Sequence, residues 1–507
     1  MDDDQYFSKY DAFLLETLEQ HHVPGASIAI VDGDSTWVKG YGIARYPDVK
    51  VTSGTLFNAA SMTKAFVAAS VSLLVDDLSF PDVQWTTPVS KLLPDDFVLS
   101  DARYTEAVTI EDILSHRSGL PDHDDACMGI DAKTPDTVES VTRKLRHLPL
   151  SAPLRSKFQY CNMMFAVGVH LIEKLTCTRM VDWLRNRIWT PLKMNSTYFL
   201  MDDIIEHKVI DQLAKGYGWD KEEETIFEIP WPVQPEGAGA GEINSTAADY
   251  ASFLRCMIDK SAPFSAAGHE ELVKPRTIMG TEPNPSWSPT LYALGWNIET
   301  YHGEKIIGHS GGTSGFECQM MFLPGKKWGV VIFTNSIDAS PAIEKICWTL
   351  IDDLLKIPRE RRFDWDEEAA KNSREYEEGD MTTEKLYPKI PEPRFPATLP
   401  LEAYAGEYAD EGYGTLKVEW KNQKLFIDCM DRTWRHVMTF EHVSGEFFAL
   451  EKRDVDQRWK DKLRAEFRLN AEGTVSQLGV DLVSELDGAM IWFQRIVSDE
   501  KKDVSAA

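Results

Sequence analysis

The order of helical and strand-like segments constrains the fold of this chain more than any other feature. Residues 6–20 place apolar side chains at helical spacing, and two β-rich runs follow around Asp32-Gly33-Asp34. Residues 107–260 are mainly helical in pattern, strand-like runs return from residue 291, and a helix is expected at about 340–356. This order predicts an α+β domain whose sheet is completed from both ends, with a helical second lobe. The cleft between the two lobes is the expected ligand site.

A second unit is expected towards the C-terminal end. Residues 364–380 carry eight acids against two bases, and residues 386–400 hold five prolines, so we predict an exposed, semi-rigid linker at 361–400. Short alternating strands across 401–507 predict a small antiparallel β-barrel. The expected domains are therefore 1–360, with a helical lobe at about 90–260, then the linker, then the barrel. The barrel is expected either to cap the cleft or to mediate formation of a homo-oligomer.

Composition excludes several classes of function. The 507-residue chain has a formal net charge of -27, which argues against nucleic acid and against an anionic membrane surface as partners. The N-terminus lacks the pattern of a secretory signal, and seven scattered cysteines show no disulfide or CxxC spacing. We therefore expect a cytoplasmic protein with reduced thiols. No metal and no cofactor is expected, because the twelve histidines form no HxxxH or HExxH pair.

The loop GLPDHDDACMGID is the densest cluster of possible metal ligands. It brings His123 together with Asp122, Asp124 and Asp125. We expect a solvated acidic loop there rather than a metal site.

A serine and a lysine at the start of an apolar helix carry the first chemical signal. Ser61 and Lys64 stand three residues apart in FNAASMTKAFVAAS, so they share one face of a helix. A serine hydroxyl needs a neighbouring base to become a nucleophile. Apolar surroundings and the positive end of a helix dipole both disfavour the ammonium form, which would lower the lysine pKa towards neutrality. The Ser61 N–H at the same helix start could bind a developing oxyanion.

Two further motifs fit this chemistry. In Tyr160-Cys161-Asn162 the phenol, held partly ionised by a lysine ammonium, could relay a proton, and the asparagine could hydrogen-bond both Lys64 and substrate. In His309-Ser310-Gly311-Gly312 a substrate could lie against a strand edge, where the Gly312 N–H would complete the oxyanion hole. Each motif alone has a plain structural reading, as a capped helix or a glycine-rich turn.

The three motifs in this order resemble the serine β-lactamase and penicillin-binding-protein superfamily, specifically its class C-like, esterase and D-aminopeptidase branch. The resemblance spans residues 8–356 and includes ILSHRSGLPD and EGAGAGEINSTAADYASFLRCM. It implies an antiparallel sheet flanked by helices, and the C-terminal region is similar to the lipocalin-like barrel of some members. Carried over, Ser61 is the acylated nucleophile, Lys64 its base and Tyr160 the general acid/base. Asn162 supports Lys64, and His309, Gly311 and Gly312 line the substrate site.

One departure from the family bears on the substrate. Many β-lactamases carry K-T-G at the third motif, where lysine attracts the drug carboxylate, whereas His309 would be largely neutral at pH 7. This favours small esters, thioesters, amides or D-amino-acid peptides over penicillins. Two loops, containing Trp231 and Trp287, are expected to frame a bulky, partly apolar pocket.

Three functions therefore remain open. The first is a serine hydrolase acting through an acyl-enzyme on Ser61. The second is an acyltransferase that passes the same acyl group to an alcohol or amine. The third is a binding or sensor protein that has lost turnover.

Overall fold

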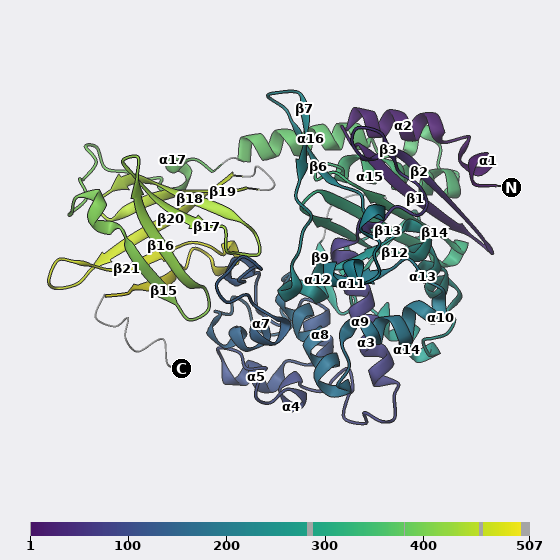
Figure 1. Ribbon diagram of the computed structural model, residues 1–507, viewed down its shortest axis with the longest axis horizontal. Helices are drawn as coiled ribbons and strands as arrows, with labels where there is room; N and C mark the ends of the chain where they lie inside the picture. The colour runs from purple at the N-terminus through teal and green to yellow at the C-terminus, as the bar shows by residue number, and fades with distance from the viewer. Residues whose placement is uncertain (1, 281–286, 380, 456–459, 498–507) are drawn as a thin grey trace.

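The computed structural model describes residues 2–280, 287–379, 381–455 and 460–497 of the chain. Figure 1 shows two bodies, a sheet-and-helix body that holds the N-terminus and a β-barrel that lies beside its helical part. The expected α+β class with a following antiparallel barrel is confirmed. No helix within these ranges combines the length and the apolar character needed to cross a membrane.

One antiparallel sheet forms the centre of the first body. Its nine strands, in spatial order, are β3 (Val49–Lys50), β2 (Ser35–Arg45), β1 (Gly25–Asp32), β14 (Trp328–Thr334), β13 (Phe316–Leu323), β12 (Glu304–Thr313), β11 (Asn297–Tyr301), β10 (Thr290–Tyr292) and β9 (Thr277–Gly280). Because β1 pairs with β14, strands from both ends of the domain lie side by side, as the order of segments predicts.

Helices cover both faces of this sheet. Alternate side chains of β1 enter two different cores, with Ile28 and Ile30 in one and Ala29 and Val31 in the other, which is the period-2 pattern of a strand buried on both faces. The first core includes α2 (Asp11–Gln20) and α15 (Ser340–Leu355), near α1 (Asp3–Phe7). The second includes α3 (Thr63–Val75) and α13 (Ala247–Asp259).

The second lobe is mainly helical and also carries short strands. Its helices are α4 (Val89–Leu92), α5 (Ala102–Ala107), α6 (Ile110–Leu114), α7 (Val138–Lys144), α8 (Met163–Thr176), α9 (Met180–Leu184), α10 (Thr190–Leu192), α11 (Leu200–Glu206) and α12 (Ala238–Gly241), with α14 (Ala266–Leu272) after α13. The strands are β4 (Phe57–Asn58), β5 (Tyr198–Phe199), β6 (Gly216–Asp220), β7 (Thr225–Ile229) and β8 (Ile243–Ser245).

The segment expected as a linker contains two helices, α16 (Trp365–Gly379) and α17 (Thr383–Leu386). The Trp365 ring stacks on Trp348 of α15 at 5.7 Å between centroids. Burial of this aromatic pair anchors the start of the acidic helix to the first body, a contact that the charge pattern alone does not reveal.

The barrel closes through pairing of its first and last strands. Its members are β15 (Gly406–Asp410), β16 (Gly414–Lys421), β17 (Lys424–Cys429), β18 (His436–Ser444), β19 (Phe447–Asp454), β20 (Lys460–Leu469), β21 (Val475–Val480) and β22 (Ile491–Arg495). Aromatic side chains fill its interior, where the Phe448 and Phe467 rings lie 5.3 Å apart. This is a packed core of the kind expected for a small barrel.

The barrel rests against the loop that we expected to be solvated. His123 is buried and its Nδ1 lies 2.6 Å from the Tyr413 hydroxyl of the barrel. Asp125 accepts a hydrogen bond of 2.7 Å from Lys452 on β19. The expectation of a solvated acidic loop is therefore wrong, because His123 and Asp125 have partners on a unit more than 280 residues away in sequence.

Candidate active site

Ser61 lies on a short turn that leads into α3. The turn is a 3-10 helix, Ala60–Met62, and α3 begins at Thr63. Ala60 adopts φ 41°, in the left-handed region, and its N–H donates to Asn58 Oδ1 at 2.7 Å. Left-handed backbone at a residue with a side chain is costly and is concentrated at functional sites, where the surrounding structure enforces it. The fold thus uses local strain to present Ser61 at the head of a buried helix.

Strand β12 fixes this turn from the other side. A Cβ on Gly311 would lie 2.6 Å from the carbonyl oxygen of Ala59, so only glycine permits this close approach. The Cys318 thiol of β13 donates to the same carbonyl at 3.2 Å. Gly311 therefore positions the nucleophile turn and does not itself line the pocket.

Three predicted residues meet at the Ser61 hydroxyl. Lys64 Nζ lies 2.8 Å from Ser61 Oγ, and the Tyr160 hydroxyl donates to the same oxygen at 2.7 Å. Residues 61 and 64 meet through helical spacing, while Tyr160 arrives from the segment before α8. Both distances are within the range required for proton transfer between a nucleophile and its base.

Burial sets the protonation of Lys64. The side chain is completely buried, and this desolvation lowers its pKa from 10.5 to about 7, although the charges of Asp124 and Asp122 act in the opposite direction. Its ammonium also donates to the carbonyl oxygen of Ala240 at 3.0 Å. At neutral pH about half of the molecules would hold a neutral amine here, against about one in 3,000 for an exposed lysine.

Tyr160 is protonated in this site. Burial raises the pKa of its phenol, and the hydrogen bond to Ser61 only partly offsets that effect. The partly ionised phenol expected from the nearby lysine is therefore wrong for the free site. His116 fixes the position of Tyr160. The His116 ring stacks on the Tyr160 ring at 4.3 Å, and His116 Nδ1 accepts a hydrogen bond from the Cys161 N–H at 3.0 Å.

Asn162 has a different partner from the one predicted. Its side-chain amide donates to Asp124 Oδ2 at 2.7 Å, and no hydrogen bond joins it to Lys64 among the described residues. The predicted support of Lys64 by Asn162 is therefore wrong. The buried loop that holds Asp124 supplies the partner of this amide instead.

His309 lies behind the pocket and not in its wall. It is buried, its Nδ1–H donates to the Ser310 carbonyl at 2.6 Å, and its Nε2 accepts from the Tyr292 hydroxyl at 2.9 Å. Burial and the nearby Lys64 lower its pKa to about 3, so the ring is neutral. The predicted neutrality agrees with this geometry, but the predicted substrate contact does not.

Gly312 is the member of the third motif that faces the pocket. A Cβ at this position would meet no atom within 4 Å, and the residue lines the space beside Ser61. Strand β12 continues past the end of its pairing with β11, which stops at Gly308, so the edge at Gly312 lies next to that space.

The two predicted pocket tryptophans lie elsewhere. Trp231 packs its ring against Phe316 at 4.5 Å and is not among the residues that line the space beside Ser61. Trp287 packs on Tyr301 and Trp348, on the face of the sheet covered by α15. The expectation that Trp287 frames the pocket is therefore wrong, because its ring packs into the core on the opposite face of the sheet.

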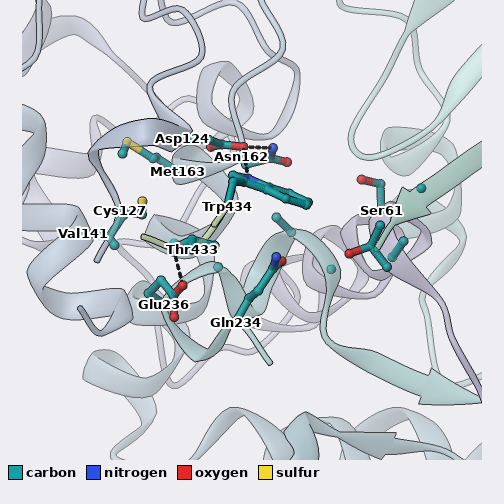
Figure 2. Close-up of a pocket in the computed structure, with 17 residues that line it drawn as sticks. Ser61, Asp124, Cys127, Val141, Asn162, Met163, Gln234, Glu236, Thr433 and Trp434 are labelled. Atoms are coloured by element: carbon teal, nitrogen blue, oxygen red, sulfur yellow. Dashed lines mark hydrogen bonds between the residues drawn. The ribbon is translucent and has the colours of Figure 1, made fainter. Parts of the chain in front are cut away.

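Two spaces that share several lining residues lie near Ser61. A narrow one of about 60 Å³ lies beside the nucleophile, and a wider cleft of about 590 Å³ passes Tyr160 and continues along the barrel. Figure 2 shows the narrow space and residues around it, among them Thr433 and Trp434. The walls shared by both spaces include Asp124, Gly312 and Trp434. The barrel thus contributes directly to the candidate site.

The comparison with family models decides the classification. The model described as Beta-lactamase matches residues 4–352, which is more than half of the chain. The chain belongs to the β-lactamase family. A second model, described as a domain of unknown function (DUF3471), matches residues 391–495, the region of the barrel.

Two curated relatives match this β-lactamase-family chain over almost its whole length. It is 39% identical to an unguisins hydrolase of Aspergillus campestris, over 95% of this chain and 90% of that protein. It is 35% identical to an unguisins hydrolase of Aspergillus violaceofuscus, over 97% of this chain and 91% of that protein. The protein is therefore a hydrolase of the β-lactamase-like type.

Two solved structures share the fold of this chain. The octameric penicillin-binding protein homologue from Pyrococcus abyssi superposes with a TM-score of 0.59 at 22% identity, over 93% of this chain and 97% of that one. The D-amino acid amidase from Ochrobactrum anthropi SV3, complexed with L-phenylalanine amide, gives 0.55 at 24% identity, over 72% and 99%.

Sequence reasoning missed three residues of the site in this β-lactamase-family chain. Asp124 was predicted to lie in a solvated loop. Nothing in the local sequence marks Thr433 and Trp434 as site residues, since they stand between two ordinary strands of the barrel. The feature that could have prompted the search was the cluster at 122–125, because several carboxylates in one loop need partners if the loop is buried.

Proposed function

We propose that this protein hydrolyses an amide bond in a peptide-like small molecule through an acyl-enzyme on Ser61. The observation that carries the proposal is the double contact at Ser61 Oγ, with Lys64 at 2.8 Å and Tyr160 at 2.7 Å. A base with a pKa near the working pH and a protonated phenol are the two groups that such a reaction needs.

The acylation half follows from the protonation states. Neutral Lys64 takes the Ser61 proton while Oγ attacks the substrate carbonyl carbon, and the carbonyl oxygen becomes an oxyanion near the Ser61 and Gly312 backbone. As the C–N bond breaks, the Tyr160 hydroxyl gives its proton to the leaving nitrogen. The Lys64 ammonium then reprotonates the phenolate, so the serine proton has moved to the amine product and Ser61 is an ester.

The deacylation half reverses these transfers with water as the nucleophile. Tyr160 passes its proton to neutral Lys64 and then takes a proton from a water molecule in the cleft, whose oxygen attacks the acyl carbon. The Lys64 ammonium returns a proton to Ser61 Oγ as the carboxylic acid product leaves. The cleft of about 590 Å³ beside Tyr160 is wide enough to admit water, which supports hydrolysis over transfer to another acceptor.

The substrate class is inferred from the relatives. Both curated relatives act on unguisins, and their similarity extends through the barrel as well as the catalytic domain. We propose unguisins, or amides close to them, as the substrates of this chain.

The experiment is a product assay by mass spectrometry with unguisins, simple amides and p-nitrophenyl esters, each with and without alcohol acceptors. Hydrolysis by the wild type and none by Ser61→Ala is the expected result. Equal hydrolysis by both proteins would refute the proposal, and acylated alcohol as the main product would replace it with acyl transfer.

A further inference from the structure

The loop between β17 and β18 leaves the barrel and ends beside Ser61. It comprises residues 430–435, and Thr433 and Trp434 of this loop line the narrow space of about 60 Å³. That volume is about a tenth of the volume of the adjoining cleft, which is about 590 Å³. In Figure 2 the Trp434 ring extends toward Ser61.

The loop is fixed to the catalytic domain through its backbone. The Gly129 N–H donates to the Asp431 carbonyl at 2.9 Å, and the Thr433 N–H donates to the Cys127 carbonyl at 3.1 Å. A Cβ on Gly129 would lie 2.8 Å from the carbonyl oxygen of Arg432, so the two segments approach at a distance that only glycine allows.

The loop is also fixed to the barrel. The Arg432 side chain is buried and donates to the carbonyl oxygens of Tyr413 and Thr415 at 2.7 and 3.1 Å. Because both ends of the loop are held, the position of Trp434 is determined by the structure and not by the chance orientation of a surface side chain.

Both pocket residues of the loop bind carboxylates of the catalytic domain. The Trp434 indole N–H lies 3.4 Å from Asp124 Oδ2, the oxygen that also accepts from Asn162. The Thr433 hydroxyl donates to Glu236 Oε1. Trp434 is thus joined, through Asp124 Oδ2, to Asn162 of the Tyr160-Cys161-Asn162 motif.

The remaining walls of the narrow space combine an apolar side with the polar side chains of Asp124, Asn162, Gln234 and Glu236. Val141, Met163 and Ala166 line it together with Cys127. The adjoining cleft, which Tyr160 borders, has far more room, because its volume of about 590 Å³ falls in the range of ordinary ligand sites.

We propose that Trp434 closes the acyl pocket and restricts the reaction to substrates whose acyl part carries a small side chain. The C-terminal barrel is then a specificity element, and the amine part of the substrate can be large. This inference rests on the proposed acyl-enzyme at Ser61.

The test compares kcat/KM for p-nitrophenyl acetate, butanoate, hexanoate and octanoate. The wild type and Trp434→Phe should prefer the short esters. Trp434→Ala should raise the octanoate-to-acetate ratio by at least about tenfold, because one methylene that no longer clashes in an apolar pocket is worth roughly 10- to 200-fold. The matched control is Trp420→Ala, a partly exposed tryptophan on β16 of the same barrel, which should leave the ratio unchanged.

A second variant acts without changing the pocket wall. Gly129→Ala should push the loop away through its Cβ and shift the ratio in the same direction, and circular dichroism checks that each variant is folded. An unchanged ratio in folded Trp434→Ala and Gly129→Ala overturns the inference.

Failure of the proposed function would look different. In that case a fluorophosphonate would not label Ser61 in the wild type, whatever the ester preference. Labelling of Ser61 with an unchanged ester ratio refutes only the role of Trp434.

Discussion

The protonation of Lys64 leads to a quantitative prediction about pH. With its pKa lowered to about 7 by burial, the neutral amine becomes available as pH rises through 7, so kcat/KM should rise over that range and then level off. An exposed lysine would delay this rise to about pH 10. The chosen perturbation is Asp124→Asn, which keeps the shape of a side chain whose charge raises the pKa of Lys64.

Removing that charge should shift the acid limb to lower pH. One nearby opposite charge changes a pKa by about 1 or more, so the midpoint should fall from about 7 to about 6. The assay is kcat/KM for an uncharged ester between pH 5 and 9. Asp131→Asn is the matched control, since Asp131 belongs to the same loop and its side chain is 62% exposed; its midpoint should stay at about 7.

Two results would refute this reasoning. A wild-type midpoint near pH 10 would mean that Lys64 is not desolvated in the working enzyme. A midpoint that moves upward in Asp124→Asn would mean that the carboxylate acts on another group.

Further predictions concern stability and the catalytic acid. Lys64→Met should abolish turnover yet raise the free energy of unfolding by about 1–4 kcal/mol at pH 7. This gain should be smaller at pH 10. Between pH 7 and pH 10 the unfolded lysine binds more protons than the folded one, so the stability of the wild type rises with pH over that range. Urea unfolding at both pH values measures the difference. Tyr160→Phe should lower kcat by roughly 10²- to 10⁴-fold, the usual contribution of a general acid/base, measured at steady state. Gly311→Ala should destabilise the protein by about 1–3 kcal/mol, since its Cβ would lie 2.6 Å from the Ala59 carbonyl, whereas Gly312→Ala meets no atom within 4 Å and should leave the melting temperature unchanged.

Each of these predictions has an outcome that contradicts it. A less stable Lys64→Met protein would show that the amine is well solvated or well paired. Near-normal turnover in Tyr160→Phe would remove the phenol from proton transfer. Equal melting temperatures for the Gly311→Ala and Gly312→Ala proteins would show that β12 does not press on the nucleophile turn.

The pair Ser61 and Lys64 could be predicted from the sequence, because their relative position depends only on residues close together in the chain. Ser61 and Lys64 meet through helical spacing, and a lysine inside an apolar helix needs a partner. The α+β order and the barrel were also predictable, because the alternation of apolar and polar residues and the turn residues are local features of the sequence. Tyr160 was predicted from the order of the three motifs along the chain. No local pattern around Tyr160 would have shown that it lies beside Ser61.

The long-range part of the site could not be predicted. Asn162 binds Asp124 instead of Lys64 because a loop buried by the barrel brings a carboxylate to it. Trp287 folds to the far face of the sheet, and Trp434 reaches the pocket from a different domain. Aromatic residues in loops have no period, so a sequence cannot say which surface they cover.

The most direct test of the account is intact-mass analysis after exposure to a fluorophosphonate, followed by peptide mapping. We predict one adduct on the wild type, located on the peptide that contains Ser61, and none on Ser61→Ala. An unlabelled wild type, or a Ser61→Ala protein that is labelled and hydrolyses esters at the wild-type rate, would contradict the assignment of Ser61 as the nucleophile.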